Sequence, residues 1–112
     1  MKMRGHDADR DALTGLLLEE SRKGLAAMQE ALARLEHRPN DTDALRALLR
    51  LARIVEGHAA TLGLKGPAEV LGQVGEILAQ LSAGTLAASF QVVDLLRASV
   101  DTLREMLVQA RG

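Results

Sequence analysis

Three histidines are the side chains of this sequence with the widest choice of chemistry, because a neutral imidazole can act as nucleophile, general base or metal ligand near neutral pH. His58 lies in a stretch of helical periodicity, whereas His6 and His37 lie in a polar leader and a predicted loop. We expect the last two to be ordinary solvated residues. The chain has no cysteine, so disulfides, thiolate nucleophiles and cysteine-bound metals are excluded.

The polar leader also brings together four side chains of metal-binding type, His6, Asp7, Asp9 and Asp11. Imidazole nitrogens and carboxylates are ligands for several divalent ions. Acidic leaders are common in proteins that bind no metal, however, so we expect neither a metal site nor a cofactor.

A second group that could do chemistry is a row of arginines between residues 41 and 62. At 100° per residue on a helix, Arg46, Arg50 and Arg53 share with Gly57 the face opposite Leu48. Such a row could bind an acidic surface on another protein. Arginines on an exposed helix face are also often only solvated charge, so both interpretations stay open.

Small residues dominate one side of the following segment. Ala68, Gly72, Gly75 and Ala79 share one side of a helix over 67–83. A surface of small side chains would let another protein approach closely, but it would equally permit tight packing within the chain.

Helices must position these side chains, because breakers divide the chain into four segments of helical periodicity. Pro39 with Asn40, Gly63 to Pro67, and Gly84 mark the divisions. We expect helices at about 9–36, 41–62, 67–83 and 86–110, after a flexible leader over 1–8. Short connections make neighbouring helices antiparallel, which predicts one all-α domain over 9–112, an up-and-down four-helix bundle.

Each predicted helix has one apolar face, and the four faces together form the predicted core. Their members are Leu13, Leu17, Leu25, Met28, Ala31, Leu32 and Leu35; Leu45, Leu48, Leu51, Ala52, Val55, Ala59 and Leu62; Val70, Leu71, Val74, Ile77, Leu78 and Leu81; and Leu86, Phe90, Val93, Leu96, Val100, Leu103 and Leu107.

The composition fits a compact domain and excludes several classes of function. Hydrophobic residues make up 47% and charged residues 26% of the 112 residues, the net charge is −1, and Phe90 is the single aromatic residue. This balance argues against disorder and against nucleic-acid binding, which requires excess basic charge and stacking side chains. No apolar run approaches the ~20 residues that span a bilayer, and the first residues lack a signal sequence. We expect no nucleic-acid or membrane partner and a cytoplasmic location.

Two segments carry a resemblance to a known family. LLEESRKGLAAMQEALARLE, residues 17–36, and LLRLARIVEGHAATLGL, residues 48–64, resemble the first two helices of the histidine-phosphotransfer (HPt) domain of chemotaxis-type histidine kinases. The family's second helix reads Arg, two small or apolar residues, His, two residues, Lys, Gly. The residues that fit its scaffold are Arg50, Ala52, Gly57, Ala59, Leu62, Gly63 and Leu64. The resemblance covers about 90 residues and implies an HPt-like bundle.

The same resemblance implies that the reactive residues have changed. Arg53 stands at the position of the phospho-accepting histidine, and Glu56 at that of a lysine that helps to hold the phosphoryl group. Gly72 and Gly75 stand where chemotaxis kinases carry a histidine and a glutamate that orient the imidazole. A guanidinium stays protonated and offers only donors, so Arg53 cannot accept phosphate by the family's mechanism. The resemblance therefore predicts a pseudo-HPt protein that is not an enzyme.

In the family, the receiver domain of a response regulator docks over this region. We therefore expect a receiver domain or a histidine kinase to bind a surface made of Arg46, Arg50, Arg53, Glu56, Gly57, Ala68, Gly72 and Gly75. Two alternatives stay open. One is active phosphotransfer through His58, which points about 140° away from Arg53 on a helix. The other is a structural bundle that forms homodimers through an apolar strip on the last helix, Val92, Leu95 and Met106.

Overall fold

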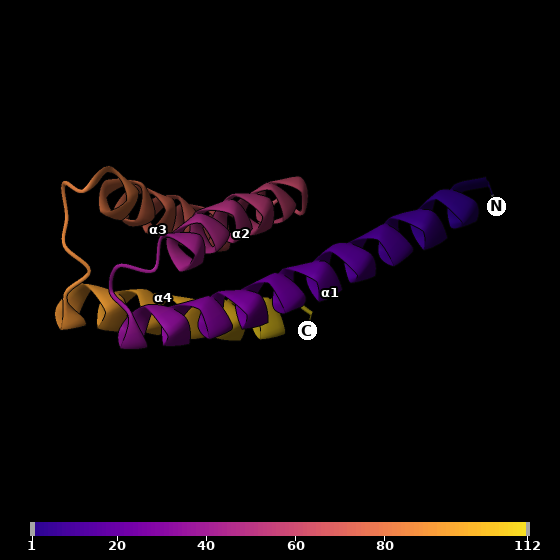
Figure 1. Ribbon diagram of the computed structural model, residues 1–112. Coiled ribbons are helices and arrows are strands. Elements are labelled where there is room, and N and C mark those ends of the chain that lie inside the picture. The colour runs from indigo at the N-terminus through magenta and orange to yellow at the C-terminus, as the bar shows by residue number, and fades with distance from the viewer. Residues whose placement is uncertain (1, 112) are drawn as a thin grey trace.

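The computed structural model describes the backbone of residues 2–111 and the side chains of residues 9–110, and this part of the chain contains four α-helices and no strand. They are α1 (Lys2–His37), α2 (Thr42–Thr61), α3 (Lys65–Ala83) and α4 (Phe90–Arg111). Each helix contacts two neighbours, so that α1, α2, α3 and α4 form a closed ring (Figure 1). The predicted all-α, antiparallel four-helix bundle is confirmed.

The helix ends follow from local sequence. Asp41 caps α2, because its carboxylate accepts a hydrogen bond from the backbone N–H of Ala44 at 3.0 Å. Gly84 ends α3 in the left-handed conformation, with φ of 80°, and its N–H donates to the carbonyl of Leu81. The hydroxyl of Ser89 accepts a hydrogen bond from the N–H of Val92 at 3.3 Å and so caps α4.

Three predicted helix starts differ from the structure. α1 begins at Lys2 rather than at about residue 9, because the expected leader contains no proline to interrupt the helical hydrogen bonds. α3 begins at Lys65 rather than Pro67, since a proline is tolerated anywhere in the first turn, where the N–H groups have no helical partner. α4 begins at Phe90 rather than residue 86, because the Gly84 turn and the Ser89 cap keep the residues between them out of the helix.

The core lies along the axis of the bundle and consists almost wholly of aliphatic side chains. Its buried members come from all four helices, and they are Leu18, Leu25, Met28, Ala31, Leu32, Leu35, Leu45, Leu48, Ala52, Val55, Ala59, Leu71, Val74, Leu78, Leu81, Val93, Leu96, Val100, Leu103 and Leu107. Two predicted core residues are exposed instead, Leu13 at 51% and Phe90 at 81%. Leu13 lies on α1 beside Thr61 and Leu62 at the end of α2, and Phe90 is the first residue of α4.

Polar side chains link α1 to α4, the two helices that are farthest apart in sequence. The amide of Gln29 donates to Asp101 at 3.1 Å and accepts from Arg104 at 3.1 Å. One end of this seam also carries an ion pair between Arg97 and Glu36. These contacts close the ring of helices on its outer surface.

Candidate functional site

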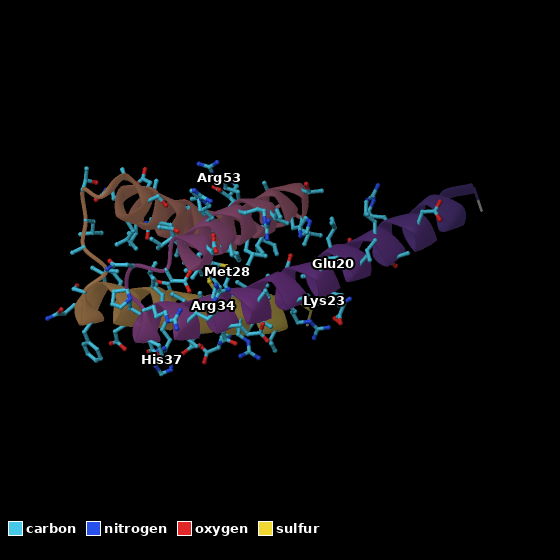
Figure 2. All side chains as sticks on the ribbon, viewed as in Figure 1. Glu20, Lys23, Met28, Arg34, His37 and Arg53 are labelled. Atoms are coloured by element: carbon cyan, nitrogen blue, oxygen red, sulfur yellow. The ribbon has the colours of Figure 1, made fainter. Side chains whose placement is uncertain are left out.

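Four residues of the expected binding surface line one groove between α2 and α3. Arg53 and Glu56 come from α2, whereas Gly72 and Gly75 come from α3. The groove has a volume of about 510 Å³. Figure 2 shows Arg53 at the outer side of α2, on the opposite side of the bundle from His37.

The buried faces of the two helices determine which residues face the groove. On α2, Leu48, Ala52 and Val55 are buried, which turns Arg53 to the solvent. On α3, Leu71 and Val74 are buried. Gly72 and Gly75 follow them by one position each and therefore lie about 100° around the helix, at the edge next to α2.

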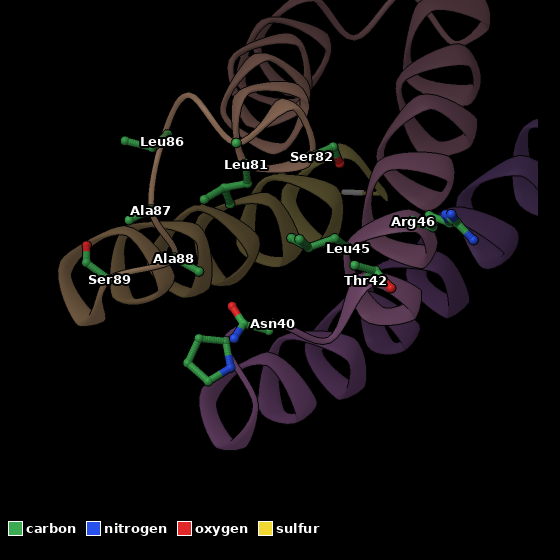
Figure 3. Close-up of a pocket in the computed structure, with 12 residues that line it drawn as sticks. Asn40, Thr42, Leu45, Arg46, Leu81, Ser82, Leu86, Ala87, Ala88 and Ser89 are labelled. Carbon is green, nitrogen blue, oxygen red and sulfur yellow. The ribbon is translucent and has the colours of Figure 1, made fainter.

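The remaining residues of the expected binding surface lie outside this groove. Gly57 is exposed on α2 with open space around it, and Arg50 is also exposed. Ala68 is partly buried and packs against the core. Arg46 lies near the N-terminal end of α2, away from the groove. It lines a cavity of about 570 Å³ together with Leu45 and Leu81, among others (Figure 3).

The side chain of Glu56 fills space that a side chain at position 72 would need. One of its carboxylate oxygens, Oε2, lies 3.3 Å from the place where a Cβ on Gly72 would be. At Gly75, by contrast, nothing lies within 4 Å of such a Cβ. Glu56 and Gly72 therefore fit each other, and this part of the groove is packed around a carboxylate.

The groove is acidic, although the exposed face of α2 beside it is basic. Its lining contains one guanidinium, that of Arg53, and three carboxylates, those of Glu56, Glu69 and Glu76. Arg53 takes part in none of the ion pairs found among residues 9–110. Glu69 and Glu76 were not among the predicted site residues, because the position of a residue around its own helix does not show which residues face a neighbouring helix.

His58 faces α1 rather than the groove. Its ring nitrogen Nδ1 lies 3.4 Å from the hydroxyl oxygen of Ser21, which is 1% exposed, and the imidazole itself is partly buried. His37 is exposed at the end of α1. The side chains of His6 and Asp7 lie outside the described residues, and residues 9–110 contain no group of three or more metal-ligating side chains.

The apolar strip expected on α4 is interrupted. Val92 and Met106 are partly buried and pack against the core, because α3 covers this side of the helix. The methyl carbon of Met106 lies 2.8 Å from the place where a Cβ on Gly66 would be, so this glycine makes room for it. Leu95 is 54% exposed and stands without the other two.

Comparison with known proteins places these features in a family context. No protein-family model matches the chain. The chemotaxis protein CheA of Borreliella burgdorferi is 27% identical over 101 residues, which are 90% of this chain but 12% of that protein. The chain thus spans about an eighth of this relative.

Solved structures agree with the sequence similarity. The CheA phosphotransferase domain from Thermotoga maritima superposes with a TM-score of 0.83 at 21% identity, over 88% of this chain and 94% of that domain. This chain has the fold of a CheA-type HPt domain. The phosphorylated P1 domain of CheA3 from R. sphaeroides, solved in complex with CheY6, gives a TM-score of 0.82 at 21% identity, over 88% of this chain and 77% of that one.

The HPt-like bundle therefore carries Arg53, Glu56, Gly72 and Gly75 together in one groove, on two antiparallel helices. The resemblance assigned these four residues to one binding surface, and their role in binding stays a prediction. No helix in the described part of the chain is long and apolar enough to cross a membrane.

Proposed function

We propose that this chain is a pseudo-HPt module of a chemotaxis-type signalling pathway, which binds a receiver domain or a histidine kinase and accepts no phosphate. The observation that carries the proposal is the exposed guanidinium of Arg53 at the edge of the α2–α3 groove. The fold and the sequence similarity to CheA support the HPt part of the proposal.

The chemistry of the groove argues against phosphate transfer. A phosphoryl acceptor needs a free lone pair, which a protonated guanidinium lacks at any physiological pH. Glu56 and its two acidic neighbours, Glu69 and Glu76, add negative charge where a phosphoryl group would sit, and like charges repel. Both the nucleophile and the electrostatic environment are therefore unsuited to the reaction.

Binding to a partner needs neither a nucleophile nor a site that attracts a phosphoryl group. The surface that we propose for it consists of Arg46, Arg50, Arg53, Glu56, Gly57, Ala68, Gly72 and Gly75. The related P1 domain of CheA3 was solved with the receiver CheY6, which supports a receiver as the kind of partner. Permanent positive charge on α2 would favour an acidic surface on that partner.

A second candidate is phosphotransfer through His58, and one contact favours it. In the tautomer whose Nδ1–H donates to the Ser21 hydroxyl oxygen, this contact would hold the ring and leave Nε2 with its lone pair as the nucleophile. His58 lies beside α1, about 140° around α2 from Arg53. This position counts against phosphotransfer through His58, because a kinase active site would have to reach a partly buried ring.

A phosphorylation assay distinguishes the two candidates. The intact protein is incubated with an autophosphorylated histidine kinase of the chemotaxis type, and acid-labile label is measured. We expect no label on the protein or on Arg53→His, because the groove of that variant still lacks the orienting residues and keeps Glu56. Label that appears on the wild type and is lost in His58→Ala would overturn the pseudo-HPt proposal.

A binding assay then tests the docking surface. Receiver domains are titrated into the wild type, Arg53→Glu and Lys23→Glu. Lys23 is the matched control, because it is exposed on α1, on the other side of the bundle from Arg53 (Figure 2). We expect Arg53→Glu to weaken binding at least tenfold and Lys23→Glu to leave it unchanged. Equal binding by all three proteins would remove Arg53 from the docking surface.

A further inference from the structure

A positive row and a negative row lie side by side on the face that α2 and α3 form. The arginine row consists of Arg46, Arg50 and Arg53 of α2, which are all exposed. The glutamate row consists of Glu69 and Glu76 of α3, which are both exposed. These two glutamates are seven residues apart and therefore lie on the same side of their helix.

The groove between the two rows is lined on the α3 side by residues with small or no side chains. Gly72, Gly75 and Ala79 line it from α3, and no atom lies within 4 Å of the place where a Cβ on Gly75 would be. Gly57 on α2 is open to solvent in the same way. Long side chains of another molecule could therefore lie across this face at Gly57 and Gly75, whereas the carboxylate of Glu56 occupies the part of the groove at Gly72.

Apart from Glu56, which stands in the groove between the two rows, the charges of this face are complementary to themselves. Rotation by 180° about an axis along the groove turns the face towards a second copy and exchanges its two sides. Each arginine row then lies over the glutamate row of the other copy, whereas an axis across the helices would place like charges together. We propose that a second copy of this chain binds the α2–α3 face in this parallel, two-fold arrangement.

One pair of charges lies at a matching level along the helices. Arg53 shares the groove with Gly72, Gln73 and Glu76, and Arg46 shares a cavity with Leu81 and Ser82. Arg50 lies between the two arginines and is therefore close to the level of Glu76. Because the two-fold axis runs parallel to the helices, residues keep their level in the second copy, and Arg50 faces Glu76 of that copy.

The dimer would be weak and sensitive to salt. Ion pairs between exposed side chains contribute little individually, and added salt screens them, with a Debye length that falls from about 10 Å at 0.1 M to about 3 Å at 1 M. The dimer would also cover Arg53, so that self-association and the docking of a receiver would exclude each other. The charge pattern alone carries this inference, whether or not the proposed function holds.

Mass measurements by light scattering and sedimentation test the dimer. At low salt and protein concentrations up to about 1 mM, we expect the mass to rise from 12.0 kDa towards twice that value, and to return to 12.0 kDa at high salt. Two variants give both rows the same sign. Arg46→Glu with Arg50→Glu makes the first row net negative, since only Arg53 stays positive there, and Glu69→Lys with Glu76→Lys makes both rows positive. Each should stay monomeric alone, and a 1:1 mixture should form a heterodimer.

Matched controls separate this arrangement from unspecific attraction. Lys23→Glu with Arg38→Glu, and Glu30→Lys with Glu105→Lys, change the net charge equally but at exposed residues of other faces. They should leave the dimer of each protein intact. A wild type that stays at 12.0 kDa under all conditions, or controls that act like the row variants, would overturn the proposal. Receiver binding is measured separately with Arg53→Glu, so that either proposal can fail alone.

Discussion

At the scale of single residues, the groove between α2 and α3 brings together side chains that fit one another. Arg53 contributes a guanidinium and Glu56 a carboxylate to the same groove. The carboxylate of Glu56 lies over Gly72, whose missing side chain leaves it the space. Gly57 and Gly75 have open space around them, although glycine is unfavourable inside a helix. Close approach of a partner would explain why small residues occupy these positions.

Replacement of the open glycines should therefore separate stability from binding. We expect Gly57→Ala and Gly75→Ala each to stabilise the protein by about 0.5–1 kcal/mol, because alanine loses less backbone entropy on folding and meets no atom here. Urea denaturation gives the free energies, and titration with a receiver gives the affinities. If these glycines admit a partner, binding weakens while stability rises. Unchanged affinity would mean that their small size serves no interface.

The residues of the site could be foreseen only in part. The resemblance singled out positions 53, 56, 72 and 75, and the structure brings them together in one groove. The resemblance did not predict that Glu69 and Glu76 share this groove, because the residues near them depend on how α3 packs against α2. The hydrogen bond of His58 to Ser21 was equally out of reach, since it joins two helices across 37 positions of sequence.

At the scale of the helices, periodicity predicted the buried sides well and the helix ends less well. Leu25, Leu48, Val74 and Leu96 are buried as expected, because apolar spacing identifies the side of a helix that faces the core. The same spacing cannot say where neighbouring helices stop, which is why Leu13 was wrongly placed in the core. The breaker Gly84 located a helix end most closely, because α3 ends at the residue before it.

The cap of α2 should make stability depend on pH. The N–H of Ala44 holds the pKa of Asp41 below its ordinary value of 3.8, and the Arg34 guanidinium, 3.2 Å away, acts in the same direction. The unfolded chain therefore binds this proton more tightly than the folded one. The stability from Asp41 is fully present above pH 3.8 and is lost as the pH falls towards the lowered pKa.

Two substitutions at this position distinguish the cap from the charge. We expect Asp41→Ala to lower the urea midpoint at pH 7, because it removes the acceptor for the Ala44 N–H. Asp41→Asn keeps an acceptor and should be closer to the wild type at pH 7, but it should lose less stability as the pH falls below 3.8. An equal acid-induced loss in Asp41→Asn and the wild type would contradict the assignment of this dependence to Asp41.

At the scale of the whole molecule, the bundle is long and narrow, with extents of 56 × 21 × 21 Å. α1 accounts for much of the length, because it runs beyond the other three helices (Figure 1). Stability must therefore be distributed unevenly along this helix. Its central and C-terminal turns contact α2 and α4, whereas Leu13 and Leu16 are more than half exposed.

Leu→Ala substitutions at two positions of α1 measure this difference in stability along the helix. Leu25→Ala removes a side chain with 0% exposure, and we expect it to destabilise the protein by about 2–5 kcal/mol. Leu13→Ala, at 51% exposure, should cost less than about 1 kcal/mol. Chemical denaturation compares the two. Similar losses would show that the projecting part of α1 is covered in solution, for example by a second copy.

The polar seam between α1 and α4 has a kinetic consequence. The other helix contacts join neighbours in sequence, but this one joins the two ends of the chain and so requires the largest loop to close. We expect the Gln29 contacts with Asp101 and Arg104 to form after the folding transition state. In stopped-flow experiments, Gln29→Ala should then accelerate unfolding and leave the refolding rate almost unchanged. The hairpins of adjacent helices would set the speed of folding, while the α1–α4 seam would set how long the closed ring survives before it opens.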